Sequence, residues 1–343
     1  MESVRRFFRT PVAGPLLIML LVAVGVALTT ERFLLRQNLM NVWLQVSIIA
    51  IVAIGATIVI LTAQIDLSSG SLVALGSVIL AGLIKKMGVP VPAAILLVIL
   101  MSTALGLVNG FFSTYGRIPS FIFTLGTLAI FRGLAFLYTQ GAPIFSVSPQ
   151  LNPLFYRTFL GMPLPFVYVV VLYAAAWAYL RYTEGGRNIY AVGGNQSAAR
   201  LSGIGVNRVR TKAFAIAGLM SGLAGVLLTA RLDSGSPNYG QGYELTAIAA
   251  AVIGGASLFG GHGNVIATLF GALTIVLVQN GLNLHGVPAA WQEIALGAII
   301  ALAVGVDMWR ADIGHALGKL LGTRRRAAEA PESETPDRVG MAR

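Results

Sequence analysis

The amino-acid sequence predicts an all-α polytopic membrane protein with about ten transmembrane helices. Of its 343 residues, 56% are hydrophobic and 11% are charged, whereas a soluble domain carries about 25% charged residues. The mean hydropathy is +0.79. Apolar runs recur with lengths near the ~20 residues that cross a bilayer as a helix. Too little polar surface remains to cover a water-soluble protein, which leaves the membrane class.

The first apolar run, about residues 14–30, follows Arg5, Arg6 and Arg9. Basic residues before an apolar stretch also occur in cleaved signal peptides. Because the run is long and no clean small-x-small cleavage site precedes Glu31, we interpret it as an uncleaved first helix. Nine further spans are predicted, at about residues 41–63, 67–86, 91–114, 119–138, 164–182, 212–232, 244–259, 264–283 and 288–306.

Lysine and arginine are distributed unevenly between the two sides of this ten-span topology. Most of them, including Arg117 and those in the interval 181–212, fall on the side of the N-terminus, and few, such as Arg132, fall on the other. Because basic loops stay in the cytoplasm, both termini are predicted to be cytoplasmic. The predicted regions are an N-terminal segment, 1–13, a transmembrane domain, 14–306, and a cytoplasmic tail, 307–343, with a disordered end.

Several function classes are excluded by the sequence. There is no cysteine, so thiolate catalysis and cysteine-based metal sites are absent. The three histidines are scattered, and no metal site is predicted. No Gly-x-x-x-x-Gly-Lys-Ser/Thr loop is present, so this chain is not expected to hold nucleotide phosphates. The net charge of +11 reflects basic cytoplasmic loops rather than a nucleic-acid surface.

The longest polar interval between apolar runs covers residues 181–212. Within it, residues 195–203 are predicted to form a short helix, because Asn195 can cap its start, alanines favour helix, and Gly203 can end it. The residues alone leave two interpretations open. The short helix is either a connector on the membrane surface or a docking element for a soluble partner.

Three stretches of sequence carry a family resemblance. They are GGRNIYAVGGNQSAARLSGIGV at residues 185–206, IDLSSGSLVALGS at residues 65–77 and GYELTAIAAAVIGGASLFGGHGNVIAT at residues 242–268. In this order and spacing they resemble the ribose-type sugar ABC importer permeases. The family also includes autoinducer-2 and rhamnose permeases. The likeness extends over about residues 41–307.

The resemblance implies a permease subunit in the bacterial cytoplasmic membrane that moves a monosaccharide or sugar-like solute. It implies no cofactor on this chain, since ATP and Mg²⁺ would bind a separate cytoplasmic ATPase. Further implied partners are an extracytoplasmic sugar-binding protein, a second identical or homologous permease, and membrane lipid. The interval 183–211 would be the coupling loop. Its predicted ATPase-coupling residues are Glu184, Gly185, Arg187, Gly194, Asn195, Ala198, Ala199, Arg200, Ser202 and Gly203.

A second group of residues is predicted to line a translocation pathway. Asp66 stands between two apolar spans, where an ionised carboxylate is costly unless it has a partner or a function. We favour a capping role for Asp66 or Ser68, which is compatible with a helix start that shapes a pathway. Amides such as Asn109 could bind a sugar or a neighbouring helix. The predicted pathway residues are Asp66, Ser68, Ser69, Gly70, Asn109, Phe121, Glu244 and Asn280.

Two further hypotheses concern topology and function. Similar Ser/Gly strings follow Asp66 and Asp233, after spans of opposite direction, as in inverted repeats; chance similarity is the alternative. The interval 140–165 is predicted to be an extracytoplasmic loop, either a connector or a partner contact. The alternative function is ion-coupled secondary transport of a small polar solute, which requires charge-relaying residues inside the membrane. No enzyme active-site pattern lies within the spans.

Overall fold

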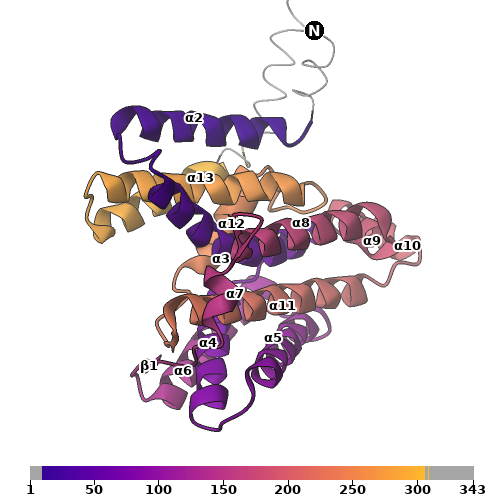
Figure 1. The fold of residues 1–343 in the computed structure, drawn as a ribbon. Helices are drawn as coiled ribbons and strands as arrows, with labels where there is room; N and C mark the ends of the chain where they lie inside the picture. The colour runs from indigo at the N-terminus through magenta and orange to yellow at the C-terminus, as the bar shows by residue number, and fades with distance from the viewer. Residues whose placement is uncertain (1–9, 306–307, 309–343) are drawn as a thin grey trace, which may run out of the picture. The chain divides into compact units, whose positions relative to one another are not determined.

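The structure is a computed structural model that describes residues 10–305 and 308. The chain divides into two units, residues 1–304 and 305–343, and the architecture below is that of the first unit (Figure 1). The predicted cytoplasmic tail lies outside the described residues except for Met308, as do the arginines before residue 10.

All ten predicted apolar runs form helices, but six of the helices within the described residues are long and apolar enough to cross a membrane. These six are α3 (Arg36–Leu61), α5 (Val91–Thr114), α6 (Ser120–Thr139), α8 (Leu164–Tyr182), α11 (Val206–Leu232) and α13 (Val265–Leu284). The shorter apolar helices are α2 (Ala13–Thr29), α4 (Ser69–Lys85), α12 (Tyr243–Ile253) and Ala289–Gly305. The protein is therefore a multi-pass membrane protein.

Helices α3 and α11 form the centre of this arrangement. Residues 46–61 of α3 are all buried, as expected for a helix that is apolar on every face. Helix α11 packs against α3, α4 and α5, and α3 in turn packs against α12 and α13. The outer helices α5, α6 and α8 instead expose many large apolar side chains. The centre is thus protein-packed, and the outer helices present the apolar surface that suits lipid.

Small residues allow the central helices to approach closely. A Cβ atom at Gly55 of α3 would lie 2.7 Å from the Cα of Ala217 in α11. A Cβ at Gly106 of α5 would lie 2.4 Å from the carbonyl oxygen of Phe214 and 3.0 Å from the Cα of Gly218. Because apolar lipid gives no hydrophobic drive between helices, such backbone contact is a main source of packing energy in membranes.

Two apolar helices follow partly buried non-helical segments. Helix α4 follows residues 62–68, of which Thr62, Asp66 and Ser68 are buried, and α12 follows the segment 234–242. The predicted span 244–259 is corrected, because α12 ends at Ile253, where Gly254 and Gly255 stop it, the latter with a φ of +84°. Such a left-handed turn is easily adopted by glycine.

The polar interval 181–212 is more helical than predicted. Helix α9 (Glu184–Gly194), which was not predicted, and α10 (Gln196–Leu201) occupy most of it. Helix α11 begins at Val206 rather than at residue 212, so its first residues lie within the predicted coupling loop 183–211. Four glycines weaken the local helix signal of α9, and the burial of Ile189 and Val192 stabilises the helix instead.

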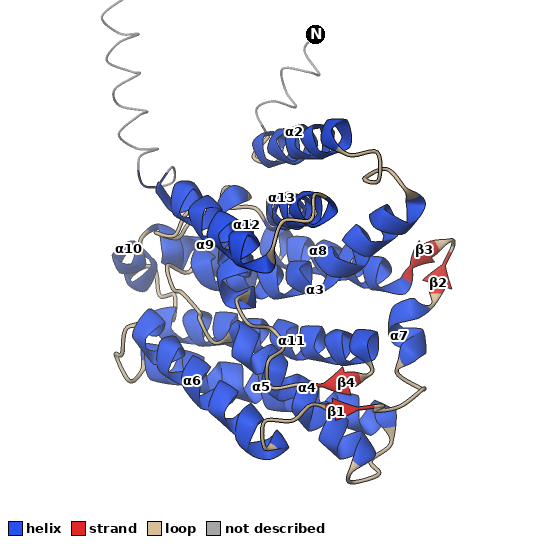
Figure 2. Ribbon diagram, turned by 90° about the vertical axis from the view of Figure 1, so that its left-hand side faces the viewer, coloured by secondary structure: helices blue, strands red, loops and turns tan. Residues whose placement is uncertain are grey.

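Short elements occupy the opposite end of the helices from α9 and α10 (Figure 2). They are β1 (Ile144–Phe145), α7 (Asn152–Tyr156), β2 (Thr158–Phe159), β3 (Met162–Pro163) and β4 (Ser234–Gly235). Strand β1 pairs antiparallel with β4, and β2 pairs with β3. The predicted loop 140–165 is therefore structured, and its first strand is tied to the segment that leads into α12.

Candidate functional site

Asp66 lies in the core and organises the start of α4. Its side chain is 5% exposed, and Oδ1 accepts hydrogen bonds from the Ser68 amide at 2.9 Å and the Ser68 hydroxyl at 2.7 Å. Ser68 is the N-cap residue of α4, but its own side chain makes no cap hydrogen bond within the described structure. The favoured capping role therefore involves both residues. Asp66 binds the amide and hydroxyl of Ser68, and Ser68 is the N-cap residue at which α4 begins.

Asn109 extends this polar cluster to α5. The fully buried amide donates from Nδ2 to the Ser68 hydroxyl at 2.7 Å. Its Oδ1 atom has no hydrogen-bond partner among the described residues, and neither does the buried hydroxyl of Ser113 one turn further along. Because an unsatisfied buried acceptor costs about 1–3 kcal/mol, these atoms mark where a polar ligand or water would be stabilised.

The starts of α4 and α12 meet at Gly70. A Cβ atom there would lie 2.0 Å from Oε2 of Glu244 and 2.2 Å from the carbonyl oxygen of Gly240. The Glu244 Oε2 atom is buried without a hydrogen-bond partner in the described part of the chain. The charges of Asp66 and Glu244 are close enough to interact. Predicted pathway residues from two distant motifs therefore share one cluster.

Arg132 is a functional candidate that the sequence analysis missed. It was assigned to the extracytoplasmic side, but it lies inside α6, where Nη1 donates to the carbonyl oxygens of Pro237 and Tyr239. Its charge also acts favourably on Glu244. A single arginine within an apolar span was the available signal, since such residues are costly unless they have partners or function.

Helix α6 also holds the segment between α3 and α4. The Ser120 hydroxyl accepts from the Ile65 amide at 3.1 Å, and the Thr124 hydroxyl accepts from the Leu67 amide at 3.0 Å. Phe121, a predicted pathway residue, is half exposed beside Ser120 and faces a cavity that Ile65 also lines. Movement of the segment between α3 and α4 would therefore displace the start of α6.

Asn280 lies apart from the other pathway candidates. It forms a reciprocal amide pair with Asn38, in which each Nδ2 donates to the other Oδ1 at 3.0 and 2.8 Å. Both polar ends of its amide are therefore used in joining α13 to the first turn of α3. This contact is the helix-bonding alternative that the sequence left open.

Helix α9 rests on the end of α3. The Thr183 hydroxyl caps its start by accepting from the Gly186 amide at 3.1 Å. Near its other end, a Cβ atom at Gly193 would lie 1.8 Å from the carbonyl oxygen of Leu61. That carbonyl accepts a hydrogen bond from the Gly261 amide at 3.0 Å. Helix α9, the end of α3 and the turn before α13 therefore meet at one point.

Helix α10 confirms the short helix predicted from the sequence. The Asn195 side chain caps it by accepting from the Ala198 amide at 2.9 Å, and Gly203 ends it with a φ of +81°. Ala199 is 4% exposed and packs with Val192 and Val206, so it faces the chain itself rather than a partner. The remaining predicted coupling residues are exposed or half exposed: Glu184, Gly185, Arg187, Gly194, Ala198, Arg200 and Ser202.

Leu201 is a second residue that the sequence analysis missed as a site candidate. It is 90% exposed at the end of α10. A single exposed leucine is ordinary on a protein surface. Leu201, however, lies on a capped helix outside the packed spans, where a partner can reach it. It offers an apolar contact that Ala199 cannot.

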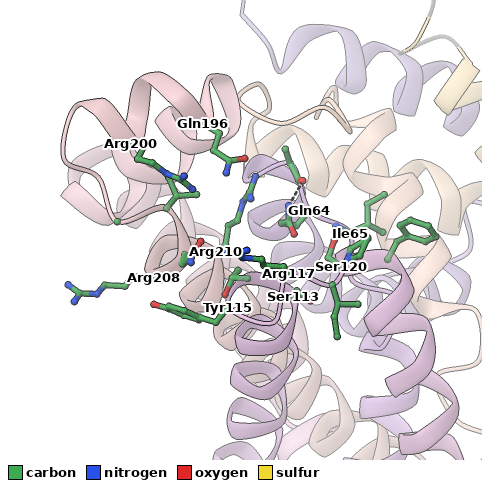
Figure 3. Close-up of a pocket in the computed structure, with 18 of the residues that line it drawn as sticks. Gln64, Ile65, Ser113, Tyr115, Arg117, Ser120, Gln196, Arg200, Arg208 and Arg210 are labelled. Carbon is green, nitrogen blue, oxygen red and sulfur yellow. Dashed lines mark hydrogen bonds between the residues drawn. The ribbon is translucent and has the colours of Figure 1, made fainter.

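A cavity of about 1070 Å³ is lined by one residue from each predicted group, Arg200 from the coupling residues and Phe121 from the pathway residues (Figure 3). We call it the arginine-lined cavity. Its walls come from the segment after α3, the turn between α5 and α6, helix α10 and the start of α11. No carboxylate from the described ranges lines it, and the charged residues that do are Arg117, Arg200, Arg208 and Arg210.

A family model described as branched-chain amino acid transport system / permease component matches residues 38–304. The chain belongs to this permease family. The resemblance found in the sequence is thereby confirmed at the level of the family.

Individual relatives are sugar permeases. The chain is 43% identical to the ribose import permease RbsC of Bacillus subtilis (strain 168) over 296 residues, which is 86% of this chain and 92% of the relative. It is 42% identical to the same-named protein of Escherichia coli (strain K12) over 298 residues, 85% and 92% of the two chains. The D-allose permease AlsC of that organism is 36% identical over 84% of this chain and 88% of its own. No solved structure matches.

Proposed function

We propose that this protein is the membrane-spanning subunit of an ATP-driven importer of a monosaccharide. The identity of over 40% with ribose import permeases along nearly their whole length carries the proposal. The ATPase and the extracytoplasmic binding protein would be separate chains, and ATP with Mg²⁺ would act on the ATPase. Specificity would be set largely by the binding protein, so pentoses and hexoses both fit.

The test is uptake by proteoliposomes that contain the permease together with its partner ATPase and binding protein. Radiolabelled ribose should accumulate when ATP is supplied to the ATPase side, and omission of the ATPase should abolish accumulation. A proton or sodium gradient should not replace ATP. Ribose uptake that persists without the ATPase would contradict the proposal.

The proposed topology has ten crossings, with both termini in the cytoplasm and inverted repeats. A helix of 11 residues such as α12 covers about half of a ~30 Å hydrocarbon core, so its extended approach segment would complete the crossing. The packing of α11 on α4 and α5 parallels that of α3 on α12 and α13. Reporters inserted near Asn152 and after Gly203 should report opposite sides of the membrane.

The proposed coupling route starts at α10, which would dock on the ATPase. Motion would pass through α9 to the end of α3 at Leu61 and then along the segment 62–68 to Asp66. The hydrogen bond from Arg210 Nε to the Thr62 carbonyl, 3.3 Å long, links α11 to the same segment. On the other face, the β1–β4 pair and residues 140–165 are proposed to contact the binding protein.

One observation favours the alternative of ion-coupled transport. Glu244 is a second acid beside Asp66, with a buried Oε2 atom, and such a mechanism requires ionisable residues of this kind. The uptake experiment separates the two functions, because an ion-coupled carrier would accumulate solute under an imposed gradient without ATP. The exposed helical loop at α9 and α10 has no role in that mechanism, so the ATP-driven function accounts for more of the structure.

A further inference from the structure

The arginine-lined cavity holds more positive charge than transport of a neutral sugar explains. Among its lining residues within the described ranges are four arginines and no acid. The positive charge of Arg200 acts unfavourably on Arg210, so these side chains gain nothing from each other. A guanidinium cluster without an internal counter-charge is suited to an external anion.

Backbone geometry supports a specific role for Arg117. It lies in the turn between α5 and α6 with a φ of +57°, a left-handed conformation that is uncommon for residues other than glycine. Residues held in such conformations cluster at functional sites, because the cost of about 1–3 kcal/mol must be offset by a selected contact. Figure 3 shows Arg117 near Arg210 and Gln64, whereas Arg208 extends away from them.

The rest of the lining suits hydroxyl groups. Gln64, Gln196 and Asn207 line the cavity and carry side-chain amides. A volume of about 1070 Å³ far exceeds a bare phosphate and lies at the top of the ~300–1,000 Å³ range of small-molecule sites. The geometry therefore fits a ligand with a phosphate at one end and hydroxyls along its body.

We propose that the arginine-lined cavity binds a small phosphorylated polyhydroxy solute, of the sugar phosphate class, from the cytoplasm. The phosphate lies against Arg117, Arg200 and Arg210, and the hydroxyls face Gln64 and Gln196. Such a ligand bridges α10 to the turn before α6. If coupling occurs as proposed above, motion of α10 must reach the segment after α3. A ligand that holds α10 against the turn before α6 restrains this motion and slows transport, and this regulatory part rests on the proposed function.

The binding test uses the purified full chain in phosphatidylcholine nanodiscs, titrated calorimetrically with ribose 5-phosphate, inorganic phosphate and ribose. Ribose 5-phosphate should bind more tightly than inorganic phosphate, and ribose should not bind at this site. Arg117→Gln and Arg200→Gln should each weaken ribose 5-phosphate binding about tenfold or more. The matched control is Arg181→Gln, an exposed arginine at the end of α8 outside the cavity, which should leave binding unchanged.

Several outcomes would overturn the inference. One is that neither ribose 5-phosphate nor inorganic phosphate binds. Another is that Arg181→Gln loses as much ribose 5-phosphate affinity as the cavity variants do. A third is that the Arg117 and Arg200 variants lose affinity only because their melting temperatures are lower. Gln64→Ala, which removes no charge, should lower affinity for ribose 5-phosphate but not for inorganic phosphate. In phosphatidylglycerol nanodiscs, loss of ribose 5-phosphate binding by wild type would assign the cavity to a lipid headgroup and overturn the solute assignment.

A separate measurement tests regulation. Ribose 5-phosphate on the ATPase side of the proteoliposomes should slow ATP-driven ribose uptake by wild type and leave uptake by Arg117→Gln unaffected. If uptake proceeds and ribose 5-phosphate does not slow it, the regulatory inference fails while the proposed function stands. If no ATP-driven uptake occurs but the calorimetric binding is present, the proposed function fails while the site stands.

Discussion

Gly193 and Gly194 provide a matched pair for testing how α9 is connected to the membrane helices. A Cβ atom at Gly193 would lie 1.8 Å from the Leu61 carbonyl oxygen and 2.5 Å from the Gly261 amide nitrogen, whereas the nearest atom to a Cβ at Gly194 is 4.0 Å away. A carbon–oxygen contact needs about 3.3 Å, so Gly193→Ala must displace α9 or the end of α3 by about 1.5 Å. Both obstructing atoms are backbone and cannot rotate away.

The two substitutions should change the free energy of folding in opposite directions. Overpacking of this kind costs about 1–3 kcal/mol, and one or two kcal/mol changes an equilibrium about 5–30-fold. Gly194→Ala instead gains helix propensity of at most about 1 kcal/mol. Gly193→Ala should therefore insert in the membrane but lose most ATP-driven uptake, and Gly194→Ala should transport like wild type. The assay is ribose uptake, with permease content and melting temperature measured in parallel.

Equal uptake by the two alanine variants would refute this reasoning. It would mean that the contact between α9 and the end of α3 is not part of the coupling route. Loss of uptake in Gly193→Ala together with loss of folded protein would show that the contact serves stability alone. The proposed route therefore requires a transport defect in protein that still folds.

Three further substitutions test the polar cluster and the loop. Asp66→Asn keeps an acceptor for the Ser68 amide and should retain folding. Asp66→Leu should lose folded protein, since an unsatisfied buried amide costs about 1–3 kcal/mol. If the Asp66→Asn variant folds but does not transport, the charge of Asp66 itself is required. Arg132→Gln removes the charged donor to the Pro237 and Tyr239 carbonyl oxygens and should lower stability by about 1.5–3 kcal/mol, as for hydrogen bonds to charged groups. Adding Glu244→Gln should recover part of this loss, and an additive loss would show that the two side chains do not interact. Leu201→Ser should reduce ATPase co-purification without lowering the melting temperature; full retention of the ATPase would exclude Leu201 from the interface.

The sequence alone determined the class, the approximate positions of the apolar helices and the family. Apolar runs of about 20 residues predict membrane helices because a bilayer leaves backbone groups no other way to be satisfied. Local chemistry also sufficed for α10, since a capping Asn195 and a terminating Gly203 act within the helix and its flanking turns. The same holds for the family resemblance, which rests on contiguous motifs.

Tertiary structure decided which residues meet. The sequence places Asp66 and Glu244 far apart, and only the packing of α4 against α12 at Gly70 brings their side chains into one cluster. Helix α9 carries four glycines, and its helicity depends on burial against α3, which outweighs local propensity. Ala199 was predicted to face a partner, but it is buried against Val192 and Val206. Which side of the six-residue helix α10 is exposed depends on how the flanking segments pack against it. Contacts between residues distant in sequence set these features, and no local pattern encodes them.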